Sequence, residues 1–256
     1  KQQRPLFLGF SSQKGGVGKT TATIHIGASL AERGYKVLLI DFDTQRNLSL
    51  GCNIENFEYT VRDFIYRKTN PVFHLKGRNN NLFILAGSDV LNEKSLNRNS
   101  LKKAIKSIEN QFDFILIDCP PKPINEELSF GEIAVIASDF VLSPILADKY
   151  SIAGIGSFFN SVLKLKKEGL AKANILGVFF NVVEENTRHF QNYYKLLKES
   201  DGGSFIINNY IRKDIDIKNS MDEGKTIFEV KPFGRAALDY ERLTDEIILK
   251  INDYEK

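Results

Sequence analysis

The sequence predicts an α/β fold with a single doubly wound, mostly parallel sheet and helices on both of its faces. Short, continuously apolar runs recur along the chain, and helical patterns separate them. Such runs are typical of parallel strands, because a strand that is covered on both sides buries both of its faces. Right-handed crossovers then produce the doubly wound arrangement. The runs with strand character are 6–10, 37–41, 82–86, 112–118, 140–144, 175–181 and 205–207.

The first run leads into a glycine-rich turn and a helical pattern over 19–33. Gly34 follows that pattern and is predicted to end the helix, because glycine readily adopts the left-handed conformation of a helix stop. Two other runs end in a carboxylate, at Asp41 and at Asp118. Ligands of doubly wound sheets bind at the carboxyl ends of the strands. We therefore expect both carboxylates to lie beside the glycine-rich turn.

The composition is typical of an ordinary globular protein and predicts one domain over residues 1–256. Hydrophobic residues make up 42% and charged residues 26% of the chain, and this length is enough to bury a sizeable core. No run approaches the roughly 20 apolar residues of a membrane span, and no signal peptide is visible. The cysteines, Cys52 and Cys119, match no metal or disulfide pattern, so reduced thiols in a cytosolic protein are expected.

Residues 14–21, Lys-Gly-Gly-Val-Gly-Lys-Thr-Thr, are predicted to bind phosphate. The general phosphate-loop pattern is G-x-x-x-x-G-K-[ST], and Gln13 stands where that pattern requires its first glycine. The remaining glycines still let the backbone turn its N–H groups inward to form an anion-binding nest. The helix that follows presents its positive N-terminal end to the phosphates. The predicted cofactor-binding positions of the loop are Gly15, Gly16, Val17, Gly18, Lys19, Thr20 and Thr21.

Three side chains of this loop have the chemistry to act on a bound nucleotide. Lys19 would contact the β- and γ-phosphates, and the Thr20 hydroxyl would hold Mg²⁺. Lys14 is a second lysine at the loop. It has the charge to neutralise phosphate oxygens in a transition state, as an arginine finger does.

A loop with an additional lysine at its start resembles the deviant Walker A motif of the ParA/MinD ATPases. Residues 41–47, Asp-Phe-Asp-Thr-Gln-Arg-Asn, resemble the D-x-D-x-Q-x-N segment of that family, and residues 112–121 resemble its Walker B strand. Residues 211–240 resemble the C-terminal stretch of its partition branch. The resemblance extends over nearly the whole chain and is closest to the ParA, Soj-like branch. It implies a P-loop ATPase whose cofactors are ATP and Mg²⁺.

The resemblance also implies roles for single residues. Lys14 would reach across a dimer interface to the phosphates of the partner's ATP, and Asp43 would position the attacking water. Asp118 would act on Mg²⁺ through a water molecule. Asp41 stands two residues before Asp43, so in an extended segment both side chains point the same way. One would then serve the water and the other the metal.

The resemblance implies three further assignments around the nucleotide. Thr21 would hold the α-phosphate, Asn181 would contact adenine, and Arg212 lies in the family's adenine-side loop. The predicted catalytic set is therefore Lys14, Lys19 and Asp43. The predicted metal set is Thr20, Asp41 and Asp118.

In the partition branch, ATP drives dimerisation, the dimer binds DNA without sequence preference, and a ParB-like partner stimulates hydrolysis. The expected function is thus plasmid or chromosome partition by a cytoplasmic, nucleoid-associated homodimer that does not bind membranes. The main alternative is a MinD-like or other cargo-positioning ATPase. MinD-type membrane binding needs a basic amphipathic C-terminal helix, whereas residues 243–256 are mixed in charge. A metabolic ligase or reductase of the same fold is a further alternative, but we recognise no second substrate pocket or cluster-binding cysteines.

The net charge of +3 is mild but unevenly distributed. Residues 62–106 contain ten basic and three acidic residues, and a second basic group lies within 164–172. Residues 184–235, in the half of the chain to which the partition branch usually assigns DNA binding, carry nine basic and nine acidic residues. A solvated surface is one interpretation of the segment 62–106, and a DNA surface is the other. Its most clustered lysines are Lys102, Lys103 and Lys106.

Overall fold

The computed structural model describes residues 5–12, 14–55, 58–67, 72–77, 80–121 and 128–254. Over these residues the chain forms a seven-stranded sheet with the strand order β3-β4-β2-β5-β1-β6-β7. Neighbouring strands run parallel except β3 and β4, which are antiparallel. The predicted mostly parallel sheet is therefore confirmed. The strands are β1 Leu6–Phe10, β2 Val37–Asp41, β3 His74–Lys76, β4 Leu82–Leu85, β5 Phe114–Asp118, β6 Phe140–Ile145 and β7 Asn174–Phe180.

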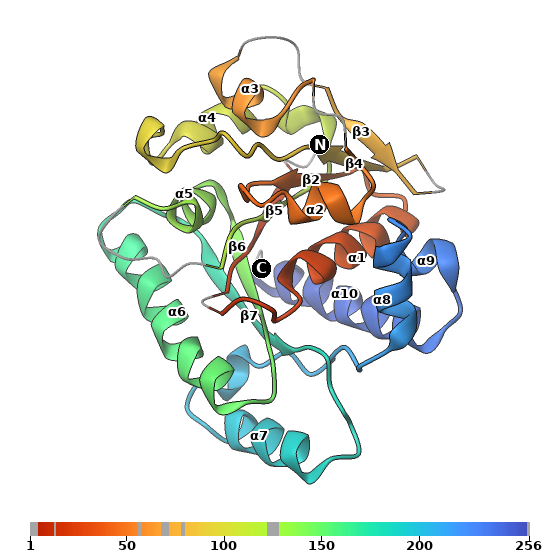
Figure 1. The fold of residues 1–256 in the computed structure, drawn as a ribbon. Helices are drawn as coiled ribbons and strands as arrows, with labels where there is room; N and C mark the ends of the chain where they lie inside the picture. Colours follow the sequence, from red (N-terminus) through yellow and green to blue (C-terminus); the bar gives the residue numbers. More distant parts are fainter. Residues whose placement is uncertain are drawn as a thin grey trace.

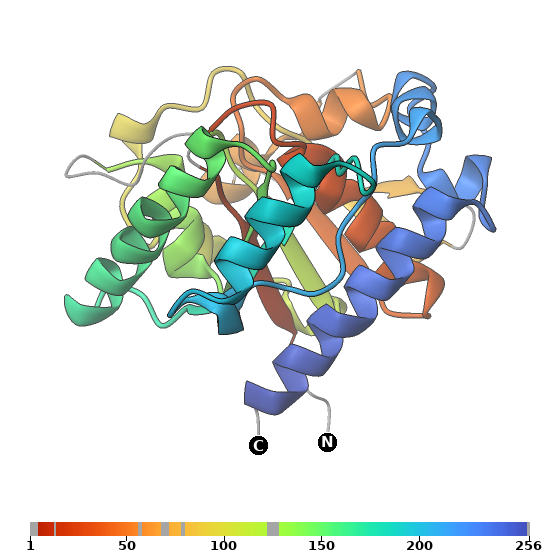
Figure 2. The same ribbon diagram turned by 90° about the horizontal axis from the view of Figure 1, so that it is seen from below.

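Helices cover both faces of the sheet (Figure 1), which confirms the doubly wound architecture. Seen from below, α10 in blue and α6 in green lie on opposite sides of the strands (Figure 2). Within the part of the chain that the structure describes, no helix has both the length and the apolar character needed to cross a membrane. The α-helices are α1 Lys19–Glu32, α2 Asn47–Gly51, α3 Val61–Tyr66, α4 Ser100–Ile105, α5 Phe130–Ala137, α6 Lys149–Lys167, α7 Arg188–Lys198, α8 Ile215–Asp222, α9 Ile227–Val230 and α10 Arg235–Tyr254.

Alternate side chains of the central strands enter two different cores. In β2, Leu39 enters the core formed with α1 and α10, whereas Leu38 and Ile40 enter the core formed with α3, α4 and α5. The helix α1 lies between the sheet and α10, so its residues from Ala22 to Ala31 are buried on every side. This burial holds the start of α1, and the loop before it, in a fixed position.

The predicted elements agree closely with the structure at the centre of the sheet. The strands β1 and β2 have the predicted bounds, and α1 ends one residue before the predicted limit. Gly34 stops the helix as predicted: its φ is 89°, and its N–H donates to the carbonyl of Ala31 at 2.9 Å.

The predicted strand over 205–207 is wrong. The chain there forms a 3₁₀ helix over Gly203–Phe205, and Ile206 makes a single isolated bridge to Val178. Ile206 and Ile207 are both buried, and this burial explains the apolar run without a strand. The strand β3 was not predicted, because its residues are half-buried or exposed at the edge of the sheet and carry no apolar pattern.

The strand register brings two sequence-distant carboxylates together. Asp41 at the end of β2 pairs with Asp118 at the end of β5, and Asp118 in turn lies opposite Phe10 at the end of β1. The glycine-rich turn begins directly after Phe10. The carboxyl ends of three neighbouring strands therefore meet at one place, as expected for this fold.

Candidate nucleotide-binding site

The turn between β1 and α1 has the backbone geometry of an anion-binding loop. Gly16 and Gly18 have φ values of 76° and 77°, which favour glycine. Gly18 is the N-cap of α1 and has no side chain with which to cap the helix. Among the described residues, no side chain is hydrogen-bonded to the N–H groups of the first helical turn, so these groups are available to a ligand. Backbone donors and the positive end of the helix dipole both suit a phosphate.

Asn181 supports this loop from the end of β7. Its Nδ2 donates to the carbonyl of Val17 at 2.9 Å, and its Oδ1 accepts from the N–H of Val182 at 3.0 Å. A Cβ atom on Gly18 would lie 2.3 Å from Asn181 Nδ2, so only glycine allows this approach. Asn181 also lines a cavity of about 430 Å³ together with Thr21 and Arg212, which we call the base-side cavity. Its amide groups are used within the protein, and its contact with adenine stays a prediction.

Lys19 and Thr20 both contact Asp118 at the end of β5. Lys19 forms a buried ion pair with Asp118 Oδ1, and the Thr20 hydroxyl donates to Asp118 Oδ2 at 2.7 Å. Burial lowers the pKa of Lys19, but the charge of Asp118 and smaller contributions outweigh burial and raise it, so the ammonium group stays charged. The structure thus brings together three residues that the sequence predicted for one site. A hydroxyl and a carboxylate are oxygen donors that suit Mg²⁺.

Asp43, which the resemblance assigns to the attacking water, lies beside the phosphate loop. It is almost fully buried, and it lines a cavity of about 260 Å³ together with Lys19, Thr20 and Asn47. Its Oδ1 accepts from the N–H of Gln45 at 2.9 Å, which fixes the direction of the side chain. The carboxylate is therefore held rigidly in the wall of this cavity.

Asp41 does not point the same way as Asp43, contrary to expectation. Its Oδ2 accepts from the hydroxyl and the N–H of Ser49, at 2.6 Å and 2.9 Å, and its Oδ1 faces the N–H of Asp43 at 3.3 Å. The chain leaves the strand at this point and turns, since the N–H of Arg46 donates to the carbonyl of Asp43. Burial, and then the charge of Asp118, raise the pKa of Asp41 to about 7. These contacts do not support its assignment to the metal.

Lys14 lies at the mouth of the site and is held by its own chain. Its Nζ is 2.9 Å from Oδ2 of Asp148, the N-cap of α6, and 5.9 Å from the ring centroid of Tyr150. Burial raises the pKa of Asp148, but hydrogen bonds from Lys14 and Ser151 outweigh it and hold the pKa below its usual value. The side chain of Lys14 is 42% exposed. The contact with Asp148 could not be predicted from the sequence, because 134 residues separate the partners.

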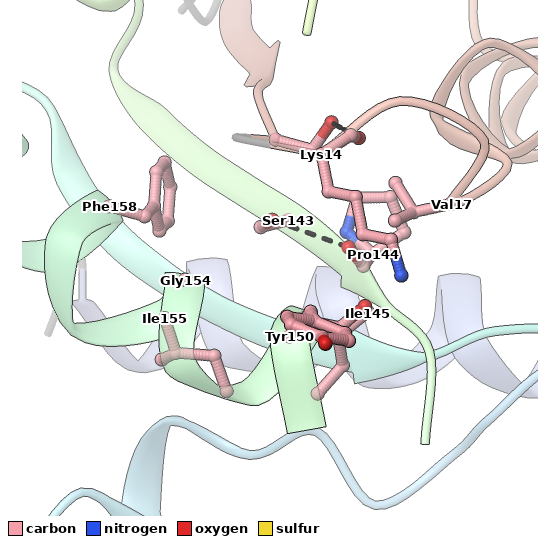
Figure 3. A pocket seen from close by; sticks show the side chains of 11 residues that line it. Lys14, Val17, Ser143, Pro144, Ile145, Tyr150, Gly154, Ile155 and Phe158 are labelled. Atoms are coloured by element: carbon pink, nitrogen blue, oxygen red, sulfur yellow. Dashed lines mark hydrogen bonds between the residues drawn. The ribbon is translucent and has the colours of Figure 1, made fainter. Parts of the chain in front are cut away.

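A cavity of about 230 Å³ lies between the phosphate loop and α6. Figure 3 shows Lys14 and Val17 on one side of it and Tyr150, Ile155 and Phe158 of α6 on the other. Lys14 therefore borders this cavity as well as the cavity of about 260 Å³ that Asp43 and Lys19 line, which we call the phosphate-loop cavity.

The larger base-side cavity, of about 430 Å³, adjoins the phosphate loop on its other side. Thr21 and Arg212, which are predicted to lie on the nucleoside side of the site, both line it. However, the guanidinium group of Arg212 is held by Asp239, with bonds of 2.9 Å and 2.6 Å. Its contact with adenine stays a prediction. The apolar walls of this cavity were not predicted; they are Val182, Ile215, Ile217, Met221 and Tyr240.

A family model described as an AAA domain matches residues 7–175, which contain the phosphate loop, Asp43 and Asp118. This match spans more than half of the chain. Together with the anion-binding loop and its buried Lys19–Asp118 pair, it defines the protein as a P-loop ATPase, with ATP and Mg²⁺ as cofactors.

Individual relatives narrow this class, and the chain belongs to the ParA/MinD family. It is 30% identical over 268 residues to the cell division protein PomZ of Myxococcus xanthus, covering 97% of this chain and 79% of PomZ. It is 29% identical over 254 residues to the chromosome-partitioning ATPase Soj of Treponema pallidum, covering 95% of this chain and 97% of Soj. The crystal structure of the cell division ATPase MinD of Pyrococcus furiosus matches with a TM-score of 0.74 at 26% identity, covering 95% of this chain and 98% of MinD.

Proposed function

We propose that this chain is a partition-type ATPase. Binding of Mg-ATP drives two copies into a dimer, the dimer binds DNA without sequence preference, and a ParB-like partner stimulates hydrolysis. Residues 1–256 act as a single domain, associated with the nucleoid in the cytoplasm. The similarity to Soj, a chromosome-partitioning ATPase, supports this proposal over the other branches of the family.

The nucleotide is proposed to bind across the loop between β1 and α1. The N–H groups of residues 15–21 and the charged Lys19 bind phosphate oxygens, since the helix start is uncapped and the ammonium is buried beside it. Thr20 and Asp118 hold Mg²⁺, which neutralises phosphate charge when bound. Asp43 orients the attacking water, because its carboxylate is fixed in the wall of the same cavity. Asp41 positions this segment through Ser49 instead of holding the metal.

The position of Lys14 carries the dimer part of the proposal. Its ammonium group lies at the mouth of the site, part-exposed, and pairs with Asp148 in the structure described here. A part-exposed ion pair of this kind contributes little free energy, about 1 kcal/mol or less. Lys14 can therefore leave Asp148 for the phosphates that a second copy binds, where the charge it neutralises is larger.

Size-exclusion chromatography with and without Mg-ATP tests this proposal. The unchanged chain should elute as a dimer with Mg-ATP and as a monomer without it. Lys14→Ala should bind ATP but stay monomeric and hydrolyse slowly, whereas Lys36→Ala, an exposed lysine elsewhere, should behave like the unchanged chain. A Lys14→Ala protein that dimerises and turns over normally would show that Lys14 has no role between subunits.

The MinD-like alternative finds no support in the last described helix. Most apolar side chains of α10, including Leu243, Ile247 and Ile251, are buried in the core against α1, whereas Leu238 and Leu249 are exposed. A helix that lies on a membrane needs such a face for lipid. In α10 that face packs into the core of the protein, so we retain DNA as the proposed binding partner.

Two basic groups that are far apart in the sequence meet at the amino ends of the strands, on the side of the sheet away from the phosphate loop. A cavity of about 520 Å³ lies there, beside the first residues of β1, β6 and β7. Lys102 and Lys106 from the segment 62–106 line it together with Lys172 from the second basic group. Lys103 is exposed beside them, and Arg67 donates to its carbonyl at 3.4 Å. Two other residues of the segment, Lys68 and Arg78, lie outside the described residues.

The basic residues of the C-terminal half are placed differently. Most of those between 184 and 235 form ion pairs with nearby carboxylates, as in Lys213–Glu184, Lys225–Glu223, Lys231–Asp216 and Arg235–Asp214. Within the described parts of the chain, Lys102, Lys103 and Lys106 form no such pair. A cation without a carboxylate partner is the better donor to a phosphate backbone. We therefore propose that DNA binds at the amino ends of the strands, at the surface with Lys102, Lys103 and Lys106.

A further inference from the structure

The helix α8 lies between the base-side cavity and the segment that follows Asp43. One side of α8 forms a wall of the base-side cavity, through Ile215, Ile217 and Met221. Met221 also lines the phosphate-loop cavity. Its Cε is so close to α2 that a Cβ atom on Gly51 would lie 2.6 Å from it. A single helix therefore contacts both the proposed base site and the helix that comes after Asp43.

The C-terminal end of α8 is anchored by side chains from two other elements. Asn53 Nδ2 donates to the carbonyl of Glu223 at 2.9 Å, and Lys76 Nζ from β3 donates to the carbonyl of Gly224. A Cβ atom on Gly224 would lie 2.1 Å from Asn53 Cγ, and the φ of Gly224 is 63°. Glycine is therefore required at this position. We call the contacts of Asn53 with Glu223 and Gly224 the α8 clamp.

A continuous series of hydrogen bonds connects the clamp to Asp43. The N–H of Asn53 donates to the carbonyl of Leu50, the N–H of Leu50 donates to the carbonyl of Arg46, and the N–H of Arg46 donates to the carbonyl of Asp43. These distances lie between 2.9 Å and 3.0 Å. Ser49, in the middle of this segment, is bound to the buried Asp41. Residues 43–53 are therefore one rigid unit, with Asp43 at one end and the clamp at the other.

The phosphate-loop helix contacts α8 from the other side. His25 of α1 is fully buried, and its Nε2 lies 3.4 Å from Ser220 Oγ of α8. The other ring nitrogen, Nδ1, lies 2.8 Å from the carbonyl of Thr21 in the first turn of α1. The position of α8 therefore depends on contacts with the start of α1 as well as on contacts with residues 43–53.

From this geometry, and on the basis of the proposed function, we infer that Asn53 is a positioning residue for ATP hydrolysis. A nucleoside in the base-side cavity packs against Ile217 and Met221 and stabilises one position of α8. The α8 clamp transmits that position through residues 43–53 to the Asp43 carboxylate. The water is then oriented for attack only when a base fills the cavity, so a triphosphate without a base is hydrolysed slowly even when it is bound.

The test compares Mg-ATP with Mg-tripolyphosphate, which carries the phosphates without a base. Asn53→Gly removes the amide but keeps the left-handed backbone that Asn53 adopts, with a φ of 55°. We expect Asn53→Gly to lower kcat for ATP about 10-fold and to leave KM for ATP within about 2-fold, because the loss concerns orientation of the water and not binding. Turnover of tripolyphosphate should stay unchanged, so the ratio of the two kcat values should fall about 10-fold.

Two further variants make the result specific. Asn80 also has a φ of 55° but lies in an exposed turn, so Asn80→Gly should leave both kcat values unchanged. Gly224→Ala must displace Asn53, and it should reproduce the effect of Asn53→Gly without adding to it in the double variant. An unchanged ratio of the two kcat values in Asn53→Gly would overturn the inference, whether neither value falls or both fall by the same factor. Absence of ATP turnover in the unchanged chain would instead refute the proposed function.

Discussion

At the scale of single residues, the environment separates carboxylates that the sequence places close together. Asp41 is enclosed by Ser49 and by Gly87, where an added Cβ atom would lie 2.8 Å from the Asp41 carboxyl carbon. Asp43 lines the phosphate-loop cavity. Two residues of the same type, two positions apart, therefore take different proposed roles. Asp41 holds the segment together, and Asp43 acts on water.

The role of Asp43 predicts that hydrolysis can be separated from binding. Asp43→Ala should bind Mg-ATP and accumulate as a dimer, while kcat falls about 100-fold or more, because a lost base or water-orienting group typically has an effect of that size. Single-turnover hydrolysis and size-exclusion chromatography measure the two properties. Asp201→Ala, in an exposed loop, is the control. Normal turnover by Asp43→Ala would remove the residue from the catalytic set.

The contact between Gly18 and Asn181 predicts a position-specific cost for alanine. Gly34→Ala should lower the free energy of unfolding by about 1 kcal/mol through its positive φ alone, since nothing lies within 4 Å of an added Cβ atom. Gly18→Ala should cost more, because it must also displace Asn181, and it should weaken ATP binding. Chemical denaturation and ATP titration check both effects. Equal losses of stability in the two variants would show that the contact with Asn181 is soft.

At the scale of elements, α1 connects the site to the core. It begins at the phosphate loop and is buried between the sheet and α10. His25 stacks on Tyr240 of α10 with ring centroids 4.8 Å apart, and its Nδ1 lies 2.8 Å from the carbonyl of Thr21. The packing of α10 on α1 thus includes a titratable group in a fully buried position.

This buried histidine predicts a pH dependence of stability. Burial lowers the pKa of His25 from 6.5 to about 4. The unfolded chain therefore binds a proton at His25 below pH 6.5, whereas the folded chain binds it only near pH 4. The contribution of His25 to the free energy of unfolding is thus present above pH 6.5 and is lost as the pH falls toward 4. Between these values the loss is about 3 kcal/mol.

The comparison with His25→Phe isolates this contribution. The phenyl ring keeps an aromatic side chain against Tyr240 but does not titrate. Chemical denaturation across this pH range should show that the free energy of unfolding of the unchanged chain falls more steeply than that of His25→Phe. Parallel pH profiles for the two proteins would contradict the assignment of the effect to His25.

At the scale of the whole molecule, the two ends of the parallel strands carry different proposed functions. The carboxyl ends of β1, β2 and β5 surround the phosphate loop. The amino ends of the strands border the cavity with Lys102, Lys106 and Lys172. Nucleotide and DNA would then bind at opposite ends of the strands in each subunit. A dimer that forms through the nucleotide side therefore presents two DNA surfaces at once and gains affinity by multivalency.

DNA binding is expected to require the ATP-bound dimer and the lysines at the amino ends of the strands. Lys102, Lys103 and Lys106 changed together to Glu should abolish retention on random duplex DNA, and each lost phosphate contact should lower the salt slope by about 0.9. Lys213, Lys225 and Lys231 changed to Glu form the matched control, because each of these lysines already pairs with a carboxylate. Loss of binding in the control alone would place DNA on the C-terminal half. No binding by the unchanged chain at low salt would refute the partition function.

Much of the fold could be predicted because its signals are local. Apolar runs mark β1, β2 and β5, since these strands are buried on both faces. The glycines and Lys19 mark the phosphate loop, since a nest needs those residue types at that spacing. The edge strand β3 and the 3₁₀ helix over Gly203–Phe205 were missed or misassigned, because an exposed strand has no apolar pattern and a buried loop can have one.

The sequence by itself determined the class of the protein and the residues of its phosphate loop, because both depend on residue types at fixed local spacing. Tertiary structure alone decided where those residues point. It turned Asp41 away from Asp43, paired Lys14 with Asp148, and brought Asn53 against the end of α8. Each of these outcomes depends on contacts between segments that are far apart in the chain or on a turn of the backbone, and neither leaves a periodic signal in the sequence.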